Sequence, residues 1–311
     1  MKLKKILSDI SNQLSREKNL IYLERYVNDV KGNFSNFSDV DIRFSPENGD
    51  EQFAVAYKYI DISCIYVVQD EPDHNLINEI MAIRNFVKFI WHPDMPSPFI
   101  GQPDGYYSMS PTSSTRTILT RGLLYNFMVK TDLDKRHFRF RRRLKGSSVK
   151  HSILISRDIV DAVKIGGVPF YGYLPESLGF IYGDISRGIG VIFREITPRP
   201  IVSDLRQLIP YFSLYSRDVF SPNDIPLLVE LIELNSSNDP LGFFVSYIVG
   251  FVQDAWVWFV RERGILPELH GQNALLEIDA HGFPRRLIHR DFQSIYSDSR
   301  IRESKGLPQF E

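Results

Sequence analysis

The chain has 311 residues, and its 37 Lys and Arg against 38 Asp and Glu give a formal net charge of −1. Hydrophobic residues make up 43% and charged residues 24%, which excludes a disordered tail, a collagen-like fibre and a highly charged nucleic-acid coat. A single cysteine, Cys64, excludes an internal disulfide and a cysteine-based metal cluster; it fits a reducing cytoplasm, and we expect it in the core.

The first 117 residues are expected to mix helices and strands. Residues 3–31 carry apolar side chains at helical spacing, and residues 53–69 are β-branched and aromatic, as in strands. Residues 74–90 are interpreted as another helix. Residues 91–117 contain five prolines, so we expect an ordered loop or a domain junction rather than a helix or a central strand.

Residues 135–150 hold eight Lys and Arg and no acid. Two interpretations remain open, a solvated face or a site for a polyanion. Because the overall charge is near zero, this local concentration suits a phosphate-bearing ligand better than nonspecific nucleic-acid binding. We therefore expect no nucleic-acid partner.

The only stretch apolar enough to suggest a membrane span is 241–260. Gln253 and Asp254 lie in its second half, where a bilayer centre would penalise the carboxylate by about 2.5–3.5 kcal/mol. We expect a helix buried inside a soluble protein, bounded by Pro240 and Gly264, with its tryptophans, Trp256 and Trp258, in the core. Near the N-terminus, polar residues interrupt the apolar run that a signal peptide needs.

Two hairpins are predicted in the second half of the chain, one over 178–196 and one over 274–291. In the second hairpin, a two-residue turn at His281-Gly282 would place Asn273 opposite Arg290 and Gln272 opposite Asp291. This register gathers four polar side chains at one end of the hairpin, those of Glu268, His270, Asn273 and Asp291. Hard oxygen donors of this kind suit Mg²⁺ and a phosphate ligand, although they could also only cap the hairpin.

A protein-kinase interpretation must be considered, because His289-Arg290-Asp291 matches the kinase triplet HRD. A kinase would place Asn five residues after the Asp, where this chain has Tyr296, and no DFG is present. A zincin is also disfavoured, because the sequence has no HExxH.

Four passages resemble, in order, the motifs of the NRPS-independent siderophore synthetases of the aerobactin type. They are His92-Pro93 with PTSSTRT (111–117), Lys130 with the arginines of 139–143, GVIFRE (190–195), and ELHGQN (268–273) with RDFQ (290–293). The resemblance covers roughly residues 85–300. It implies an α+β fold, a cupped-hand architecture of helices and antiparallel sheet that is short at both ends. It also implies an N-terminal α/β region over 1–90 and a nucleotide-binding catalytic core over 91–311.

The function that this resemblance implies is ATP-dependent ligation in the cytoplasm, for iron acquisition. A carboxylate such as citrate attacks the α-phosphate of ATP, pyrophosphate leaves, and an amine or hydroxyl captures the acyl-adenylate. ATP and Mg²⁺ are the expected cofactors, no membrane is expected to be involved, and a homodimer or a partner subunit is possible. The alternatives are a nucleotide-binding relative without turnover, a subunit of a split synthetase, and a phosphotransferase that would release ADP.

The resemblance also implies roles for individual residues. Ser114 and Thr117 would donate hydrogen bonds from their hydroxyls to the phosphates, and Arg116 would bind the phosphates with bidentate hydrogen bonds. Lys130 and Arg142 would add positive charge near the α-phosphate or the carboxylate. The alternative for Ser114 is a purely structural role, in which it caps a helix that begins near Thr115.

Glu268, Asn273 and Asp291 would hold Mg²⁺, with Asn273 also near ATP, and His270 would touch the carboxylate substrate or the pentavalent phosphate. Arg194 would be a further anion clamp. His270 could instead be a satisfied buried histidine, Arg194 could pair with an acid on a neighbouring strand, and His92 is expected to be structural.

Overall fold

The computed structural model describes residues 2–8, 10, 12–29, 39–46, 51–137 and 140–310. The chain forms two compact units that interleave in sequence. Unit 1 contains Met1–Val30, Asp158–Leu174 and Thr197–Glu311, and unit 2 contains Lys31–Arg157 and Pro175–Ile196. The boundary expected between residues 90 and 91 falls inside unit 2.

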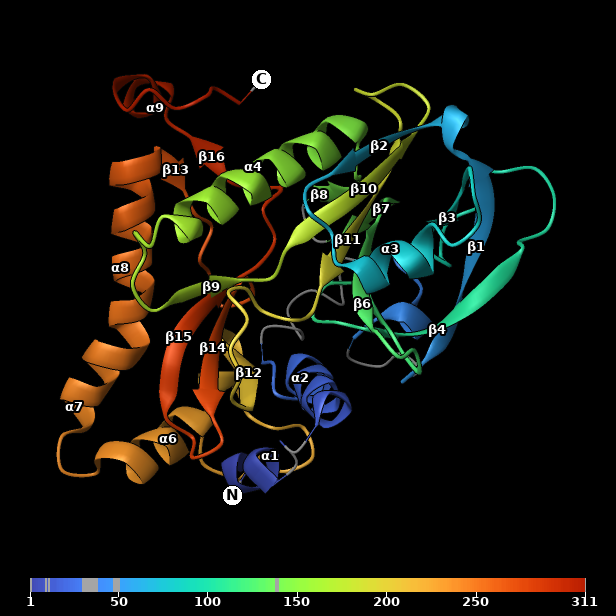
Figure 1. Cartoon of the computed structure of the whole chain (residues 1–311). Coiled ribbons are helices and arrows are strands. Elements are labelled where there is room, and N and C mark those ends of the chain that lie inside the picture. Colours follow the sequence, from blue (N-terminus) through green and yellow to red (C-terminus); the bar gives the residue numbers. More distant parts are fainter. Residues whose placement is uncertain are drawn as a thin grey trace. The chain divides into compact units, whose positions relative to one another are not determined.

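Unit 2 is built on an antiparallel sheet of eight strands in the order β2-β10-β11-β6-β5-β4-β1-β3 (Figure 1). In chain order the strands are β1 (Phe53–Asp61), β2 (Ile65–Gln69), β3 (Phe86–Ile90), β4 (Gly105–Pro111), β5 (Thr117–Thr120), β6 (Phe127–Thr131), β10 (Glu176–Tyr182) and β11 (Ile189–Glu195). A separate two-stranded ribbon pairs β7 (Leu133–His137) with β8 (Phe140–Arg142).

Both faces of this sheet carry apolar side chains. Successive residues of a strand point to opposite sides, so neighbouring apolar residues pack into different clusters. Phe180 and Phe193 pack with Leu76 and Ile80 of α3 (His74–Ile80). Their neighbours Ile181 and Ile192 pack instead with Val149 and Ile153 from the first half of α4 (Gly146–Lys164). A helix therefore covers each face of the sheet.

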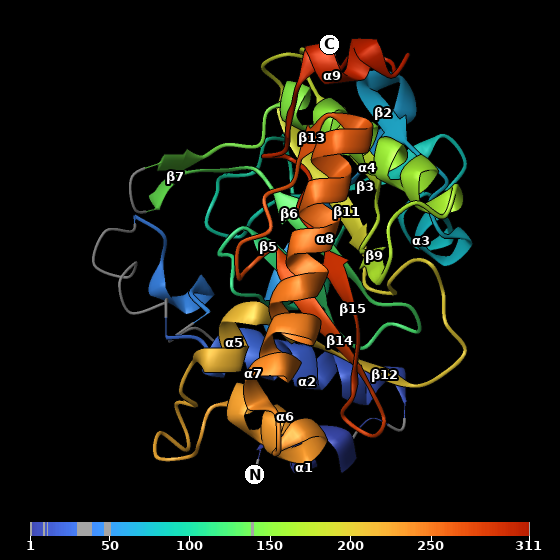
Figure 2. The same cartoon turned by 90° about the vertical axis from the view of Figure 1, so that its left-hand side faces the viewer.

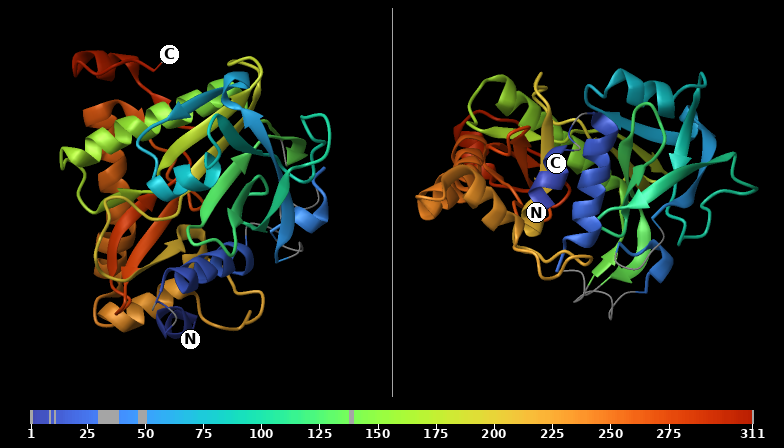
Figure 3. Two further views of the ribbon diagram at one scale, coloured as in Figure 1. Left: turned by 45° about the vertical axis from the view of Figure 1, so that its right-hand side comes forward. Right: turned by 90° about the horizontal axis from the view of Figure 1, so that it is seen from below.

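Unit 1 contains a smaller sheet in the order β12-β14-β15-β9, in which only the β9–β15 pair is parallel among the described strands. Its strands are β9 (Tyr171–Tyr173), β12 (Arg206–Pro210), β14 (Ala274–Asp279) and β15 (Pro284–His289); β13 (Ile265–Leu266) pairs with β16 (Tyr296–Ser297). The helices are α1 (Lys2–Ser8), α2 (Gln13–Tyr26), α5 (Tyr211–Tyr215), α6 (Leu227–Ser236), α7 (Pro240–Phe243), α8 (Gly250–Trp258) and α9 (Ser299–Ser304). Helix α2 lies along β12 (Figure 3), and α8 packs against β15 (Figure 2).

Several predicted elements are confirmed. Helices α1 and α2 fall within 3–31 apart from Lys2, strands β1 and β2 fall within 53–69, and β10 and β11 form the hairpin expected over 178–196. The helix predicted over 74–90 is correct only as far as Ile80. Asn85 takes the left-handed conformation (φ 66°), and Phe86–Ile90 pairs with β1 as β3. Its predicted second half is thus a strand, because pairing with a distant segment outweighed the local pattern.

The prediction of a loop over the whole proline-rich passage is wrong for β4, which is a central strand between β5 and β1. The only proline in β4 is its last residue, Pro111, so the strand keeps its earlier backbone donors. The prediction of a buried Cys64 is also wrong. Cys64 is exposed, because it ends a short 3₁₀ turn (Ile62–Cys64) between two strands.

The apolar helix runs from Pro240 to Arg263, and Gly264 ends it in the left-handed conformation (φ 58°), so both predicted boundaries are confirmed. By length and composition it could cross a membrane, but core helices of soluble proteins pass the same test. One stripe of its side chains is buried, namely Phe243, Ile248, Phe251, Ala255 and Phe259.

The prediction that this whole helix is buried is wrong, since only 28% of its most apolar window is buried. Leu241 is 72% exposed and Trp256 is 43% exposed, while Trp258 is half-buried. This helix therefore has more apolar surface than its packing within unit 1 buries.

The register predicted for the second hairpin is confirmed over four pairs, from Ala274 opposite His289 to Glu277 opposite Arg286. The turn itself differs from the prediction. Asp279 N donates to Phe283 O, and Gly282 is left-handed (φ 81°), so the loop has three residues, and a bulge near Arg285 restores the register.

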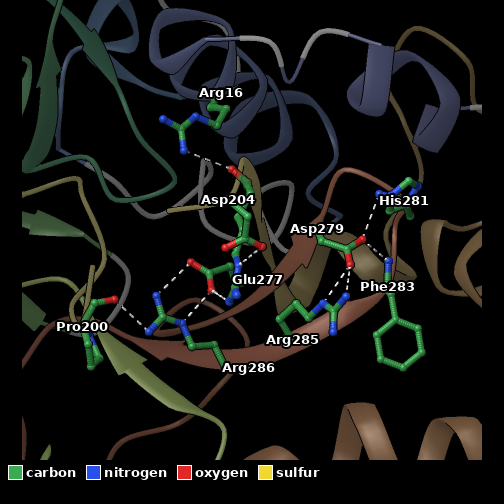
Figure 4. Close-up of polar contacts among 10 residues, drawn as sticks. Arg16, Pro200, Asp204, Glu277, Asp279, His281, Phe283, Arg285 and Arg286 are labelled. Atoms are coloured by element: carbon green, nitrogen blue, oxygen red, sulfur yellow. Dashed lines mark hydrogen bonds and ion pairs between the residues drawn. The ribbon is translucent and has the colours of Figure 1, made fainter. Parts of the chain in front are cut away.

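Charged side chains fix this turn, as Figure 4 shows. The carboxylate of Asp279 accepts the backbone N–H groups of His281 and Phe283 and pairs with Arg285. These bonds explain why the loop takes three residues rather than two.

Candidate functional site

The residues predicted for the site fall in both units. Unit 2 holds what we call the basic cluster, Ser114, Arg116, Thr117, Lys130 and Arg142, together with Arg194. Unit 1 holds what we call the acidic cluster, Glu268, His270, Asn273 and Asp291.

The basic cluster begins in a tight turn that leads into β5. Thr117 N donates to Ser114 O (3.2 Å), and Thr112 Oγ1 donates to Thr117 O (2.7 Å) and accepts from Ser114 N (3.2 Å). The chain continues as a strand from Thr117, so Ser114 does not cap a helix. The turn holds the Ser114 hydroxyl and the Arg116 side chain only two residues apart.

Strand pairing adds the other members of the basic cluster. Thr117 lies directly opposite Lys130 on β6, and opposed residues of an antiparallel pair point to the same face of the sheet. Arg116 Nη1 donates to the carbonyl oxygens of Arg142 and Arg143 (3.2 Å each). The structure therefore brings the turn, Lys130 and the Arg142 segment together within one unit.

His92 supports the same turn. Its Nδ1 accepts from Asp94 N (3.1 Å), so the neutral ring carries its proton on Nε2 and donates to Thr115 O (3.0 Å). Burial lowers the pKa of His92 to about 4. The structural role expected for His92 is thus the support of the turn that carries Ser114 and Arg116.

Acids outside the basic run offset much of its charge. Arg143 pairs with Asp132 (3.2 Å) and Asp134 (3.1 Å), and Lys135 pairs with Asp94 (2.7 Å). Burial raises the pKa of Asp132. Because the run is paired in this way, its composition alone no longer argues for a phosphate site.

Arg194 has the partner that the alternative interpretation expected. It lies opposite Glu176 across β10 and β11, and the two buried side chains form an ion pair to which Ser152 adds a hydrogen bond. The Arg194 guanidinium thus helps to hold the sheet together.

The acidic cluster is organised by the turn over 270–273. Asn273 N and Ala274 N both donate to His270 O (2.9 and 3.0 Å), and Gln272 N donates to His270 Nδ1 (3.1 Å). Glu268 reaches two members of the cluster, since its carboxylate lies 3.8 Å from His270 Nε2 and 3.4 Å from Asn273 Nδ2. The His270 side chain is 48% exposed, which argues against a buried structural histidine.

The second motif joins the first as the hairpin register predicts. Arg290 N donates to Asn273 O (3.0 Å), and Arg290 Nε donates to Gln272 O (2.9 Å). The next residue, Asp291, is in the left-handed conformation (φ 70°), which Asp and Asn adopt more readily than other non-glycine residues.

A magnesium site is a prediction that the acidic cluster fits by chemistry. Two carboxylates and an amide oxygen suit Mg²⁺, which usually keeps several waters and shares substrate phosphates. Over the residues that the structure describes, no group of three or more His, Cys, Asp or Glu is placed to hold a metal by itself. Ligation by Glu268, Asn273 and Asp291 would therefore depend on phosphate and water ligands as well.

A cavity of about 500 Å³ in unit 1 is not suited to a nucleotide. Its walls come from α5, α6, the apolar helix and two motif residues, Leu269 and Gly271, and they carry no charged side chain. A triphosphate or a polycarboxylate would lose its hydration there without gaining a counter-charge.

No protein-family model matches the chain, and no curated protein matches it in sequence. Solved structures do match. Petrobactin biosynthesis protein AsbB from Bacillus anthracis superposes with a TM-score of 0.71 at 15% identity, over 95% of this chain and 58% of that protein. The chain has the fold of the siderophore synthetases.

Two further structures, both from a hypervirulent pathotype of Klebsiella pneumoniae, agree. Aerobactin synthetase IucC matches with a TM-score of 0.68 at 16% identity, over 96% of this chain and 59% of its own. ATP-bound aerobactin synthetase IucA matches with a TM-score of 0.64 at 16% identity, over 95% and 62%. The predicted α+β fold is confirmed, and the chain spans about three-fifths of the length of these synthetases.

Proposed function

We propose that the chain is an ATP-dependent synthetase of the siderophore type, which activates a carboxylate as an acyl-adenylate and condenses it with an amine or a hydroxyl. The observation that carries this proposal is the synthetase fold combined with the side-by-side placement of ELHGQN and RDFQ. The match to an ATP-bound synthetase supports ATP as the nucleotide.

In the proposed first step, a substrate carboxylate oxygen forms a bond to the α-phosphorus while the bond to the pyrophosphate oxygen breaks. Negative charge then builds on the phosphate oxygens, so fixed positive charge lowers the barrier. Lys130 and Arg142 would supply this charge, while the Ser114 and Thr117 hydroxyls and Arg116 would orient the phosphates.

Glu268, Asn273 and Asp291 would hold Mg²⁺, which would neutralise the charge of the phosphates. In the second step the nucleophile attacks the acyl carbon, AMP leaves with the electron pair of the broken C–O bond, and the nucleophile loses a proton. Water would take that proton. His270 would donate from Nε2 to the substrate carboxylate or to the phosphate, because its Nδ1 already accepts from Gln272 N (3.1 Å) and the neutral ring therefore carries its proton on Nε2.

The test is to incubate the purified chain with ATP, Mg²⁺, citrate and hydroxylamine. We expect citrate-dependent release of AMP and pyrophosphate together with formation of a hydroxamate. Folded protein that releases no pyrophosphate with any polycarboxylate would overturn the proposal, and ADP as the product would indicate a phosphotransferase.

A second candidate is a nucleotide-binding relative that does not turn over alone, or one subunit of a split synthetase. It is favoured by one observation, namely that the chain spans about three-fifths of the matched synthetases. Calorimetry that detects Mg·ATP binding without pyrophosphate release would support this candidate, and turnover by the isolated chain would remove it.

A further inference from the structure

We propose that Glu24 and Arg290 form a positioning pair for the acidic cluster, an inference that rests on the proposed function. Glu24 lies on α2, 266 residues before Arg290, and both side chains are almost fully buried. Their ion pair connects the N-terminal helix to the RDFQ motif.

Arg290 binds the neighbouring motif through two separate donors. Its backbone N–H binds Asn273 O (3.0 Å), and its Nε binds Gln272 O (2.9 Å), while Nη1 binds the Glu24 carboxylate. A guanidinium holds these donors in one plane at fixed angles, so fixing Nη1 on Glu24 also fixes Nε on the 272–273 turn.

The pair thereby sets the position of two predicted metal ligands. Asn273 is held through its carbonyl oxygen, and Asp291 follows Arg290 directly in the chain. The backbone of Asp291 is left-handed (φ 70°) and continues directly from the anchored Arg290. Without Glu24, the Arg290 charge would be buried uncompensated and its side chain would seek another partner.

The same hairpin offers a matched control, the buried ion pair between Glu277 and Arg286 (Figure 4). Glu277 also binds Arg206, and Arg286 also binds Pro200 O (3.0 Å). These partners lie outside the two motifs. Damage to this pair therefore reports the cost of losing a buried ion pair as such.

The experiment compares E24Q and R290K with E277Q and R286K. We expect E24Q and R290K to lower kcat/KM by about tenfold or more and to raise the Mg²⁺ concentration for half-maximal rate, because small misplacements of ligands cost large factors in rate. E277Q and R286K should lower the unfolding temperature similarly but change kcat/KM by less than about threefold. Equal losses of kcat/KM in both pairs would overturn the proposal.

Hydrogen exchange of the 268–274 peptide gives a readout that needs no activity. We expect faster exchange there in E24Q than in wild type or E277Q, and unchanged exchange would overturn the proposal. If wild type releases no pyrophosphate, the proposed function fails, while this exchange difference still decides the positioning role. If E24Q does not fold, E24D retains the charge with a shorter reach and is measured in the same way.

Discussion

At the scale of single residues, hydrogen bonds to the backbone organise both clusters more than ion pairs do. His92 holds Thr115, and Arg290 holds Gln272 and Asn273. The contact between Asn273 and Arg290 could be predicted by counting along the hairpin. The Glu24–Arg290 pair could not, because no spacing rule links residues 266 positions apart, and Glu24 does not stand out on α2, where Glu17 and Arg25 are buried as well.

The depressed pKa of His92 predicts a pH-dependent stability. In the unfolded chain the His92 imidazole has its ordinary pKa of 6.5 and binds a proton below that pH. In the folded protein its pKa is about 4, so the imidazole stays neutral down to about that pH. The free energy of unfolding should therefore fall as the pH falls from 6.5 towards 4, by about 3 kcal/mol in all. Urea unfolding between pH 4.5 and 7 measures this. H92Q keeps a donor for Thr115 O but cannot titrate, so an identical pH dependence in H92Q would contradict the assignment.

Asp291 provides the second prediction at this scale. Asp291→Asn should lower the rate with Mg·ATP by about tenfold or more, because it removes a charge from the predicted metal site. Asparagine also tolerates the left-handed conformation, so the unfolding temperature should change little. Steady-state kinetics and thermal unfolding are measured on the same protein. If the variant unfolds and loses activity only in proportion, Asp291 is structural.

At the scale of elements, local patterns predicted well where a segment pairs with its neighbour in sequence. The hairpins over 176–195 and 274–289 follow alternation and turn residues that lie in the same short window. Phe86–Ile90 and Gly105–Pro111 were misassigned because each pairs with β1, which lies some thirty to fifty residues earlier. The partner, rather than the local sequence, decides such strands.

The three-residue loop makes Gly282 a specific requirement. Its φ of 81° disfavours any side chain, and a Cβ there would come within 2.7 Å of Leu234 Cδ2. Gly282→Ala should therefore lower the free energy of unfolding by about 1–3 kcal/mol. Because the acidic cluster lies at the other end of the hairpin, kcat/KM at low temperature should stay near that of wild type. Denaturant titration and kinetics test both parts, and an unchanged stability would argue against the observed loop.

At the scale of the whole molecule, the fold was predicted through motif resemblance, whereas the surface was not. Composition and hydropathy indicated a buried helix at 241–260, yet Leu241, Val245 and Trp256 stay largely exposed in the described residues. Hydropathy reports how apolar a segment is and says nothing of how many of its faces find a partner. Exposed apolar stripes of this kind mark contact surfaces or aggregation-prone sites.

This stripe predicts concentration-dependent association of the purified chain. Val245→Glu and Trp256→Glu should reduce both self-association and binding of an apolar dye, since each places a charge on the exposed stripe. Their unfolding temperatures should stay close to that of wild type, because both side chains are already about half exposed. Sedimentation velocity over a range of concentrations measures the association. A wild-type chain that stays monomeric and binds no dye would contradict the prediction.

The central claim is that the chain activates a carboxylate on ATP, and ATP–pyrophosphate exchange tests it most directly. With Mg²⁺ and a polycarboxylate present, label from pyrophosphate should enter ATP, and omission of the carboxylate should abolish the exchange. Folded protein that binds Mg·ATP but exchanges no label with any polycarboxylate would contradict the account.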